Sequence, residues 1–406
     1  MKHRIIVLGA GYTGAVAAGR LARRLRAEDV AITLVNAEPD FVERVRMHQL
    51  AVGQDLKPRP FSEMFAGTGV ELRIAEVTAV DVDRRTVAVT GIDTDTDTDT
   101  NGVEELTYDS LVYALGSTWD AQGVPGTAEH AHELAGRTGA LRLRGRLSGL
   151  AAGQPVVVVG GGLTGLEAAA EIAEARPDLD VALAARGELG DWLSPKGRRH
   201  VRKVFGGLGI TVHEHTTVTG TEAGRVTAAD GTTLPAAVTV WTTGFAAHPI
   251  AKATTLEVSD SGQIVVDGTM RSVSHPDVYA IGDAALVRGP GEKPLRMSCA
   301  SGVPTAWQAA DSLAARLTGG KLPTASLRYF NQCISLGRRE GLIQYVTADD
   351  RSVSAALTGR MAAVYKELVC KGAAWGVANP TLGMPTRRRR VAQEPARPGP
   401  AIEEAA

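Results

Sequence analysis

The chain has 406 residues, 44% of them hydrophobic, and a formal net charge of -1, so it has room for about two or three globular domains. This balanced charge argues against the basic surface that nucleic-acid binding requires. Its three cysteines, Cys299, Cys333 and Cys370, lie far apart and lack C-x-x-C spacing. They support neither a disulfide framework nor a zinc site, and a reducing cytoplasm fits best.

Residues 4–19 read RIIVLGAGYTGAVAAG. The apolar run at 5–8 predicts a strand, and the glycines that follow have the G-x-G-x-x-G spacing of a strand–turn–helix unit that binds a dinucleotide. The first glycine makes the turn, the second leaves room for a pyrophosphate, and the third lets the helix pack on the strand while its N-terminus faces the phosphates. The alternative is a glycine-rich turn without a ligand. The candidate binding residues here are Gly9, Ala10, Gly11, Tyr12, Thr13 and Gly14.

A second strand is predicted at 31–35 and ends at Asn36, where dinucleotide sites usually carry an acid that holds a ribose hydroxyl. Asparagine can still accept that hydrogen bond. The following stretch is irregular and cationic, with Arg44, Arg46 and His48 alternating with apolar residues. These side chains either face the cofactor or form the solvated basic face of a strand or loop.

Strands are predicted at 70–77 and 85–90, before the run DTDTDTDT at 93–100. This run lacks the glycine and the bidentate glutamate of a calcium loop, so it predicts a lengthened hairpin tip and no metal site. Residues 108–117, YDSLVYALGS, predict a buried strand that ends in a turn of small residues. The stretch 119–153 is rich in glycine and proline and marks a domain boundary.

A second fingerprint, VVVVGGGLTGLE, occupies residues 156–167. Gly160, Gly162 and Gly165 repeat the spacing of the first fingerprint, and the helix that follows is predicted to end near Arg176, before a proline. Two fingerprints in one chain predict two bound dinucleotides.

The next strand is predicted at 181–184 and is followed by Ala185 and Arg186. A carboxylate normally holds the ribose of NADH at this position, whereas an arginine without a carboxylate favours the 2′-phosphate of NADPH. Alternatively, Arg186 points into water. Further strands are predicted at 238–245 and within 263–280, and Asp283 then stands at a turn suited to a polar ligand.

The motifs GAGYTG, YDSLVYALGS, GGGLTGLE, VWTTGF and VYAIGDAA occur in this order between residues 5 and 317. With them the chain resembles the two-dinucleotide-binding flavoprotein superfamily, most closely type II NADH:quinone oxidoreductases and apoptosis-inducing-factor-like reductases. The resemblance implies an α/β fold with an FAD domain, an inserted NAD(P)H domain and a small C-terminal α+β segment. The expected parts are 1–118 and 245–320 for FAD, 119–244 for NAD(P)H, 321–385 for a C-terminal hairpin and helix, and 386–406 for a basic and then disordered tail.

The resemblance also implies roles for single residues. Asp283 would hold the ribityl and pyrophosphate end of FAD. Glu167 would face the nicotinamide, orient it and relay a proton; alternatively it only caps or packs its helix. The remaining expected cofactor-binding residues are Asn36, Arg44, His48, Val77, Ala114, Leu115, Gly116, Leu163, Thr164, Thr243, Gly244, Gly282, Thr305 and Ala306.

The chain departs from its relatives at three places. No C-x4-C follows the first fingerprint, which excludes a disulfide-reductase mechanism, and the cysteines do not stand where sulfide-oxidising relatives carry theirs. The quinone-site pattern A-Q-x-A-x-Q is replaced by AWQAAD at 306–311, so the electron acceptor is left open.

At the C-terminal end a hairpin is predicted from 332–336 and 342–347, followed by a helix over 355–377. The helix has an apolar stripe formed by Leu357, Met361, Val364 and Leu368, interrupted by Glu367 and Gly372. In type II enzymes this region anchors the protein to a membrane, and Arg360, Lys366, Lys371 and the cluster 387–390 would suit an anionic lipid surface on the inner face of the cell membrane. Alternatively, the helix packs on its own core or on a second subunit, as in a homodimer.

Two functional hypotheses follow. The first is an FAD enzyme that takes hydride from NAD(P)H, with NADPH favoured, and passes electrons to a quinone or a similar small acceptor. The second is a flavin-binding and nucleotide-binding redox sensor of slow turnover that contacts partners through its arginine-rich terminus.

Overall fold

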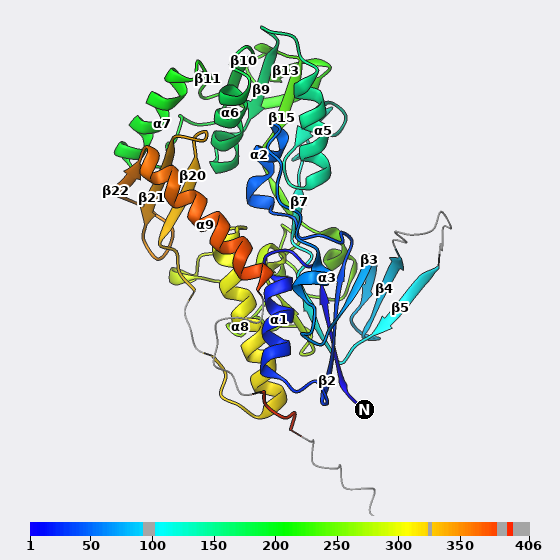
Figure 1. The fold of residues 1–406 in the computed structure, drawn as a ribbon. Helices are drawn as coiled ribbons and strands as arrows, with labels where there is room; N and C mark the ends of the chain where they lie inside the picture. The colour runs from blue at the N-terminus through cyan, green and yellow to red at the C-terminus, as the bar shows by residue number, and fades with distance from the viewer. Residues whose placement is uncertain (92–101, 324–326, 380–387, 393–406) are drawn as a thin grey trace, which may run out of the picture.

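The computed structural model describes residues 1–91, 102–323, 327–379 and 388–392. It is a mixed α/β structure in which two sheets of mainly parallel strands are packed with helices (Figure 1). The predicted fold class is therefore confirmed. The Asp-Thr run at 93–100, Arg387 and the tail from 393 lie outside the described residues, so what was expected of them stays a prediction.

The first sheet consists of β1 (His3–Leu8), β2 (Val30–Asn36), β3 (Val70–Asp81), β4 (Thr86–Gly91), β5 (Val103–Thr107), β6 (Ser110–Tyr113) and β18 (Val278–Ala280). Its order is β18-β6-β1-β2-β3-β4-β5, and the pairs from β18 to β3 are parallel. Ile5, Val7 and Leu8 of β1 are fully covered, as in a parallel sheet with both faces packed. The chain thus leaves this sheet after β6 and returns to it with β18. The polar, mostly exposed strand β5 is not predicted by any apolar pattern.

Helices α1 (Gly14–Arg24) and α8 (Cys299–Thr318) lie side by side next to this sheet (Figure 1). The guanidinium of Arg20 donates two hydrogen bonds, of 2.6 and 2.7 Å, to the carboxylate of Asp311. A bidentate pair of this kind fixes the two helices against each other. Asp311, which replaces the glutamine of the quinone-site pattern, therefore stabilises the packing of α8 on α1.

The second sheet consists of β8 (Ala131–Glu133), β9 (Pro155–Val159), β10 (Asp180–Ala184), β11 (Thr211–His213) and β15 (Val238–Trp241), all parallel, in the order β11-β10-β9-β15-β8. Around it lie α5 (Arg137–Ser148), α6 (Leu163–Ala175), α7 (Pro195–Gly207) and a small antiparallel sheet of β12 (Val218–Glu222), β13 (Gly224–Ala228) and β14 (Thr233–Ala236). The helix after the second fingerprint ends before Pro177, as predicted. Helix α5 was not predicted, because glycines mask its buried face of Ala140, Leu143 and Leu147.

The strand predicted over 238–245 is wrong in its second half. β15 ends at Trp241, and Phe245 begins β16 (Phe245–Ala247), which pairs with β7 (Ser117–Trp119). Gly244, with φ +74°, turns the chain between the two strands and leaves Phe245 40% exposed. The other short elements are α3 (Phe61–Met64), α4 (Thr127–His130), β17 (Ile264–Val265), β19 (Ala285–Leu286) and the 3-10 helices η2 (Pro249–Ala253), η3 (Gly282–Ala284) and η4 (Pro290–Glu292).

The C-terminal part is an antiparallel sheet of β20 (Asn331–Ser335), β21 (Gly341–Val346) and β22 (Ser352–Thr358), followed by α9 (Arg360–Ala378). The hairpin was predicted, but the helix was predicted to start too early. Leu357 pairs with Ile343 in the sheet, and Gly359, with φ +80°, separates β22 from α9. Leu357 therefore does not belong to the helical stripe.

Helix α9 packs against β20, β21 and β22, and it also contacts α1, which lies next to the first sheet (Figure 1). Residues 388–392 lie at the end of α1, where the backbone of Arg389 bonds to Arg24 and Arg26. Nowhere in the described parts of the chain does a helix have the length and hydropathy to cross a membrane.

Candidate functional site

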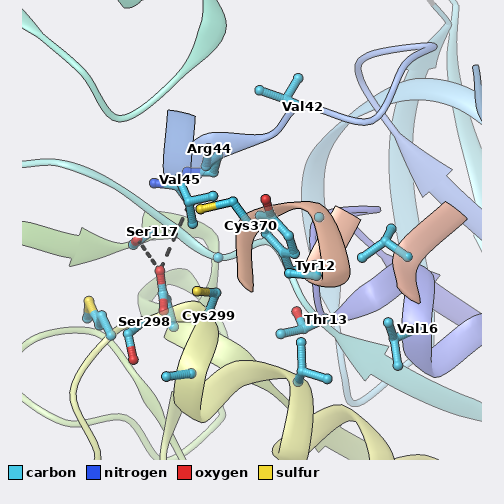
Figure 2. Close-up of a pocket in the computed structure, with 18 of the residues that line it drawn as sticks. Tyr12, Thr13, Val16, Val42, Arg44, Val45, Ser117, Ser298, Cys299 and Cys370 are labelled. Carbon is cyan, nitrogen blue, oxygen red and sulfur yellow. Dashed lines mark hydrogen bonds and ion pairs between the residues drawn. The ribbon is translucent and has the colours of Figure 1, made fainter. Parts of the chain in front are cut away.

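A cavity of about 1220 Å³ lies where the loop before α1, next to the first sheet, faces the start of α6, next to the second sheet. Pockets for single small molecules measure about 300–1,000 Å³, so this cavity lies above the usual range. Figure 2 shows part of its wall. The predicted site residues that line it are Gly9, Ala10, Gly11, Tyr12, Thr13, Asn36, Arg44, His48, Ala114, Leu115, Gly116, Gly162, Leu163, Thr164, Glu167 and Asp283.

The three glycines of the first fingerprint have separate tasks. Gly9 has φ +88°, and a Cβ placed on it would lie 2.5 Å from the carbonyl oxygen of Ala114. A Cβ on Gly14 would lie 1.8 Å from the carbonyl oxygen of Gly9, so α1 approaches the strand too closely for any other residue. A Cβ on Gly11 would meet no protein atom within 4 Å. The fold therefore requires the first and third glycines, whereas the second leaves open space for a ligand.

The second fingerprint repeats this division of tasks. Gly160 has φ +126°, and a Cβ on Gly165 would lie 1.8 Å from the carbonyl oxygen of Gly160. Gly162 faces open space, since a Cβ placed on it would have no protein atom within 4 Å. Both loops thus present a bare backbone at the N-terminus of a helix, which is the arrangement that binds a pyrophosphate.

Asn36 ties the first loop to the end of β2. Its Oδ1 accepts a hydrogen bond of 2.8 Å from the backbone N–H of Ala10, and its Nδ2 donates to the carbonyl of Glu38 at 2.8 Å. A carbonyl oxygen has two lone pairs, so Oδ1 keeps one for a ribose hydroxyl. The asparagine fits both the loop and the predicted ligand.

Asp283 is held by two segments that are distant in sequence. Ser117 donates a hydrogen bond of 2.7 Å to its carboxylate, and the Arg44 guanidinium lies 4.0 Å away (Figure 2). Arg44 is itself anchored by a bond of 2.7 Å to the carbonyl of Ala135. The carboxylate therefore lies at the cavity wall with a fixed orientation.

Some predicted residues do not line the cavity: Gly14, Val77, Gly160, Gly165, Arg186, Thr243, Gly244, Gly282, Thr305 and Ala306. Several of them support the wall from behind. The N–H of Gly282 donates to Thr305 Oγ1 at 3.0 Å, and a Cβ on Gly282 would come within 2.8 Å of Thr13. Val77 is different, since its side chain is buried in the hydrophobic core of the first sheet.

The solvated basic face considered for residues 41–53 is wrong. This stretch forms the 3-10 helix η1 (Arg44–Arg46) and helix α2 (Met47–Ala51), and it buries Arg46 and His48. Arg46 bonds to the carboxylate of Glu367 on α9 at 3.0 Å. Alternation of charged and apolar residues cannot reveal such burial, because the partner carboxylate lies more than 300 residues away.

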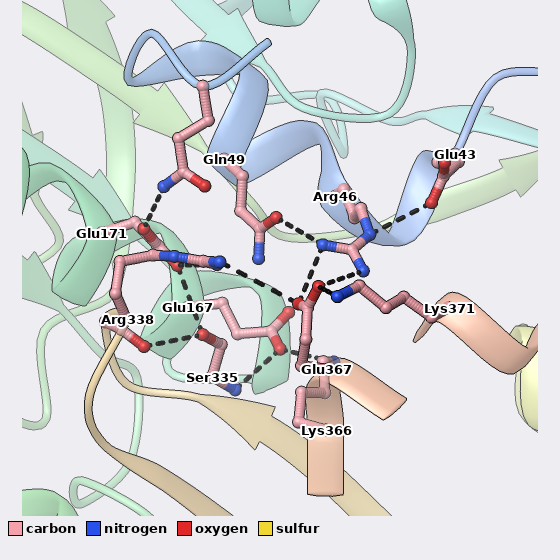
Figure 3. A network of polar contacts seen from close by, with 12 residues as sticks. Glu43, Arg46, Gln49, Glu167, Glu171, Ser335, Arg338, Lys366, Glu367 and Lys371 are labelled. Carbon is pink, nitrogen blue, oxygen red and sulfur yellow. Dashed lines mark hydrogen bonds and ion pairs between the residues drawn. The ribbon is translucent and has the colours of Figure 1, made fainter. Parts of the chain in front are cut away.

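Glu167 is buried and joined to the C-terminal part of the chain (Figure 3). Its Oε1 accepts a hydrogen bond of 2.8 Å from Lys366 Nζ and one of 3.0 Å from the backbone N–H of Ser335. Its other oxygen lies 3.8 Å from His48 Nδ1. Lys366 also donates to the carbonyl of Cys333 at 3.0 Å. The sequence prediction that Lys366 faces lipid is therefore wrong. That prediction rested only on the place of this lysine beside the apolar stripe of the helix.

The charges around Glu167 follow from burial and proximity. Burial lowers the pKa of His48 to about 4 against the opposing effect of Glu167, so this imidazole is neutral at pH 7. Burial, the largest single effect, favours the neutral amine of Lys366, but Glu167 and the nearby Cys370 and Cys333 together raise the pKa of Lys366 above its ordinary value. Glu167 and Lys366 thus form a buried, charge-assisted hydrogen bond at the cavity wall.

All three cysteines line the cavity and are free thiols. Burial raises the pKa of each of them, that of Cys333 to about 11. The reactive form of cysteine is the thiolate, so these thiols are poor nucleophiles at neutral pH. Within the described ranges, no three metal-binding side chains gather into a metal site.

Two dinucleotide loops that face one cavity define a pyridine-nucleotide-dependent flavoprotein oxidoreductase. The chain belongs to the pyridine nucleotide-disulphide oxidoreductase family, whose profile matches residues 3–312. The resemblance noted from the motifs is thereby confirmed, and the protein is an oxidoreductase that uses FAD and NAD(P)H.

Similar proteins come from several organisms. An NADH dehydrogenase-like protein of Mycobacterium tuberculosis is 31% identical over 328 residues, covering 74% of this chain and 77% of the relative. A demethylphylloquinone reductase of Synechocystis is 25% identical over 380 residues, covering 90% and 92%. The structure of NDH2 from Plasmodium falciparum superposes with a TM-score of 0.77 at 15% identity, over 94% of this chain and 97% of that one, and shows the common fold.

Replacing Gly11 with valine tests the first site. Because a side chain there meets no protein atom, Gly11→Val should fold but lose its flavin absorbance. It should also melt earlier, since a ligand at 100 times its Kd stabilises a protein by about 2.7 kcal/mol.

Gly162→Val is the matched control, because Gly162 has the same open surroundings in the second loop. It should keep one FAD per chain and weaken only the binding of NAD(P)H. Full FAD occupancy in Gly11→Val would contradict the assignment of the first loop.

Proposed function

We propose that this protein oxidises NAD(P)H, with NADPH favoured, and passes the electrons through FAD to a quinone or a similar small acceptor. The observation that supports this most directly is the shared cavity, which is lined by both glycine loops and by Glu167. The flavin, when bound, supplies the redox chemistry. The chain supplies binding, orientation and the movement of protons.

The proposed domain boundaries follow the two sheets. Residues 1–118 and 245–320 would form the FAD domain and 119–244 the NAD(P)H domain, because β18 completes the sheet that contains β1, whereas all strands of the second sheet and of the small sheet β12-β13-β14 lie within 119–244. Residues 321–385 would then form a C-terminal unit that closes the cavity, since Lys366 and Cys370 line it.

The preference for NADPH rests on the end of β10. Ala185 is buried directly after this strand and Arg186 is exposed beside it, with no carboxylate at either position to repel a 2′-phosphate. A charged hydrogen bond contributes about 1.5 to 3 kcal/mol, which corresponds to a preference of about 10- to 100-fold.

Steady-state kinetics tests both the donor and the enzyme class. With a soluble quinone, NADPH oxidation should run at about 1 to 1000 turnovers per second, and Arg186→Ala should lower kcat/KM for NADPH by about 10- to 100-fold while leaving NADH nearly unchanged. Arg225→Ala, on the exposed strand β13, is the control and should change neither value. A tenfold preference of the wild type for NADH would contradict the role of Arg186, and turnover well under one per second would favour the sensor hypothesis.

A quinone acceptor is supported by the name of the Synechocystis relative and by the apolar side of the cavity. Trp307, Pro304, Val369 and Trp375 line this side, on α8 and α9. Trp307 is 45% exposed and Trp375 is 60% exposed, so this wall continues onto the surface. A flat, poorly soluble ring can stack against these aromatic side chains as it enters the cavity.

Glu167 and Lys366 would take part in the transfer of protons to the quinone. Reduction of a quinone to a quinol takes up two protons, and Glu167 stands at the cavity wall with the Lys366 ammonium 2.8 Å away. Lys366 keeps the charged carboxylate stable and fixes its direction, and Glu167 can hold and pass on a proton at its Oε atoms.

Replacing Glu167 with glutamine tests this role. Glu167→Gln keeps an acceptor for Lys366 and Ser335 but cannot pass on a proton, so stopped-flow should show quinone reduction slowed by about 100-fold. Flavin reduction by NAD(P)H should slow only modestly, and ferricyanide, which takes an electron and no proton, should react almost as in the wild type.

Glu367→Gln is the control, because Glu367 belongs to the same group of ion pairs but contacts Arg46. Glu367→Gln should reduce the quinone and ferricyanide at the wild-type rates. Equal rates for wild type and Glu167→Gln with both acceptors would leave Glu167 a structural residue.

Helix α9 supports contact with a membrane surface. Its exposed apolar side chains recur at helical spacing, and basic residues such as Lys371 stand among them. These exposed side chains are Met361, Val364, Tyr365, Leu368, Val369 and Trp375. None of them belongs to a hydrophobic core cluster of the described residues, and we propose that a lipid surface covers them, because the apolar wall of the cavity begins on the same helix.

Vesicle flotation tests this surface. The wild type should float with vesicles that contain anionic lipid, and the double change Met361→Glu and Leu368→Glu should weaken binding at least tenfold, since each buried apolar side chain contributes about 1.5 to 3 kcal/mol. Leu141→Glu, 42% exposed on α5, is the control and should bind like the wild type. A wild type that stays unbound and sediments as a dimer would favour the second subunit.

A further inference from the structure

Helix α6 carries a second buried acid, Glu171, one turn beyond Glu167. Glu171 is 1% exposed, yet it lines a separate cavity of about 410 Å³ on the outer side of the helix. Arg338 and Arg339, both exposed, also line this outer cavity. Helix α6 therefore presents one acid to the flavin cavity and the next to a cavity at the surface.

Ser335 bridges the two acids (Figure 3). Its backbone N–H donates to Glu167 Oε1 at 3.0 Å, and its hydroxyl donates to Glu171 Oε1 at 3.3 Å. Gln54 Nε2 donates to the other oxygen of Glu171 at 3.1 Å. Residues four apart on a helix are neighbours on its surface, so the two carboxylates lie close to each other as well.

The charges that face Glu171 come from two elements. Arg338, in the loop after β20, has its guanidinium 3.9 Å away, and its backbone N–H is held by Glu174 of α6 at 2.6 Å. Glu174 and Glu167 are the negative neighbours on α6 itself. Unlike Glu167, with its lysine at 2.8 Å, Glu171 has no cation at hydrogen-bond distance among the described residues.

We propose that Glu171 is the proton-loading residue of the active site, which takes protons from the outer cavity and passes them to Glu167. This inference rests on the proposed quinone reductase function. One NAD(P)H, one quinone and one proton from solution give NAD(P)+ and a quinol, so each turnover needs one solvent proton at the buried end of the cavity, where Glu167 lies. In the step, an O–H bond breaks at Glu171 and one forms at Glu167, and Glu171 then binds a proton from water in the outer cavity.

The protonation of Glu171 supports this role. Burial raises its pKa to about 7, partly opposed by Arg338, whereas its ordinary value is 4.5. The folded protein thus binds a proton here between pH 4.5 and about 7 that the unfolded chain does not bind. This contribution to stability is present at low pH and is lost as the pH rises through about 7.

Glu171→Gln in the full-length, FAD-loaded protein is the kinetic test. The variant keeps a polar side chain for Ser335 and Gln54 but cannot pass on a proton. We expect the wild-type rate of quinone reduction to decline above about pH 7, and we expect Glu171→Gln to slow this reaction at least tenfold, to lose the decline and to show a larger solvent isotope effect. Flavin reduction and ferricyanide reduction should stay within about twofold of the wild type.

Glu174→Gln is the matched control, because Glu174 lines the same outer cavity but does not contact Ser335. Well below pH 7 it should change none of these rates by more than about twofold, and its pH profile should move to lower pH, because the charge of Glu174 also raises the pKa of Glu171. Glu171→Gln should unfold no more readily than the wild type above pH 7, since it removes a buried charge. A quinone rate and pH profile equal to those of the wild type would overturn the proposal and leave Glu171 as a tether for Ser335.

Infrared difference spectra supply a test that needs no turnover. The wild type should show a protonated carboxyl band that titrates near pH 7 and is missing in Glu171→Gln. In Glu167→Gln this titration should move to lower pH, because the negative charge of Glu167 raises the pKa of Glu171. An unshifted titration overturns the coupling, whereas a wild type that shows the coupling but reduces no quinone overturns only the proposed function.

Discussion

The buried contact between Glu167 and Lys366 holds the site together. It joins the helix of the second fingerprint to the C-terminal helix at 2.8 Å, and both side chains are almost completely shielded from water. Removing one partner of a buried ion pair typically costs about 3 to 5 kcal/mol, because the other charge is left uncompensated. The flavin cavity is therefore complete only when the C-terminal sheet and α9 are docked against the second sheet.

Close backbone approach is the second constraint. Thr13, Gly282 and Gly302 come from three distant segments, and a Cβ on either glycine would lie 2.8 Å from the Thr13 methyl group. The backbone packs equally closely within each fingerprint, where a Cβ on the third glycine would lie 1.8 Å from the carbonyl oxygen of the first. These contacts fix the loop backbone, the Asp283 carboxylate and the N-terminus of α1 at one side of the cavity.

Helix α6 links the second glycine loop to two buried acids. Its N-terminus presents a bare loop to the cavity, its first full turn carries Glu167 to the cavity wall, and its next turn carries Glu171 to the second cavity. A single rigid helix fixes these spacings, which side chains on separate loops could not hold as accurately. Ser335 adds a fixed bridge from the C-terminal sheet, so the docking that completes the cavity also holds both acids of α6 in place.

The sequence by itself determined the fold class, both dinucleotide loops and the part of the cavity wall that these loops and the strand ends form, because glycine spacing after an apolar strand is a local pattern with a defined geometry. Asn36 and Asp283 were also found from their places at strand ends. Only the tertiary structure decided what Arg46, His48, Lys366 and Glu171 do, since each depends on a partner distant in the chain. A buried lysine and a lipid-facing lysine look alike in sequence, and burial and pairing, which fix their charge and reactivity, exist only after the chain has folded.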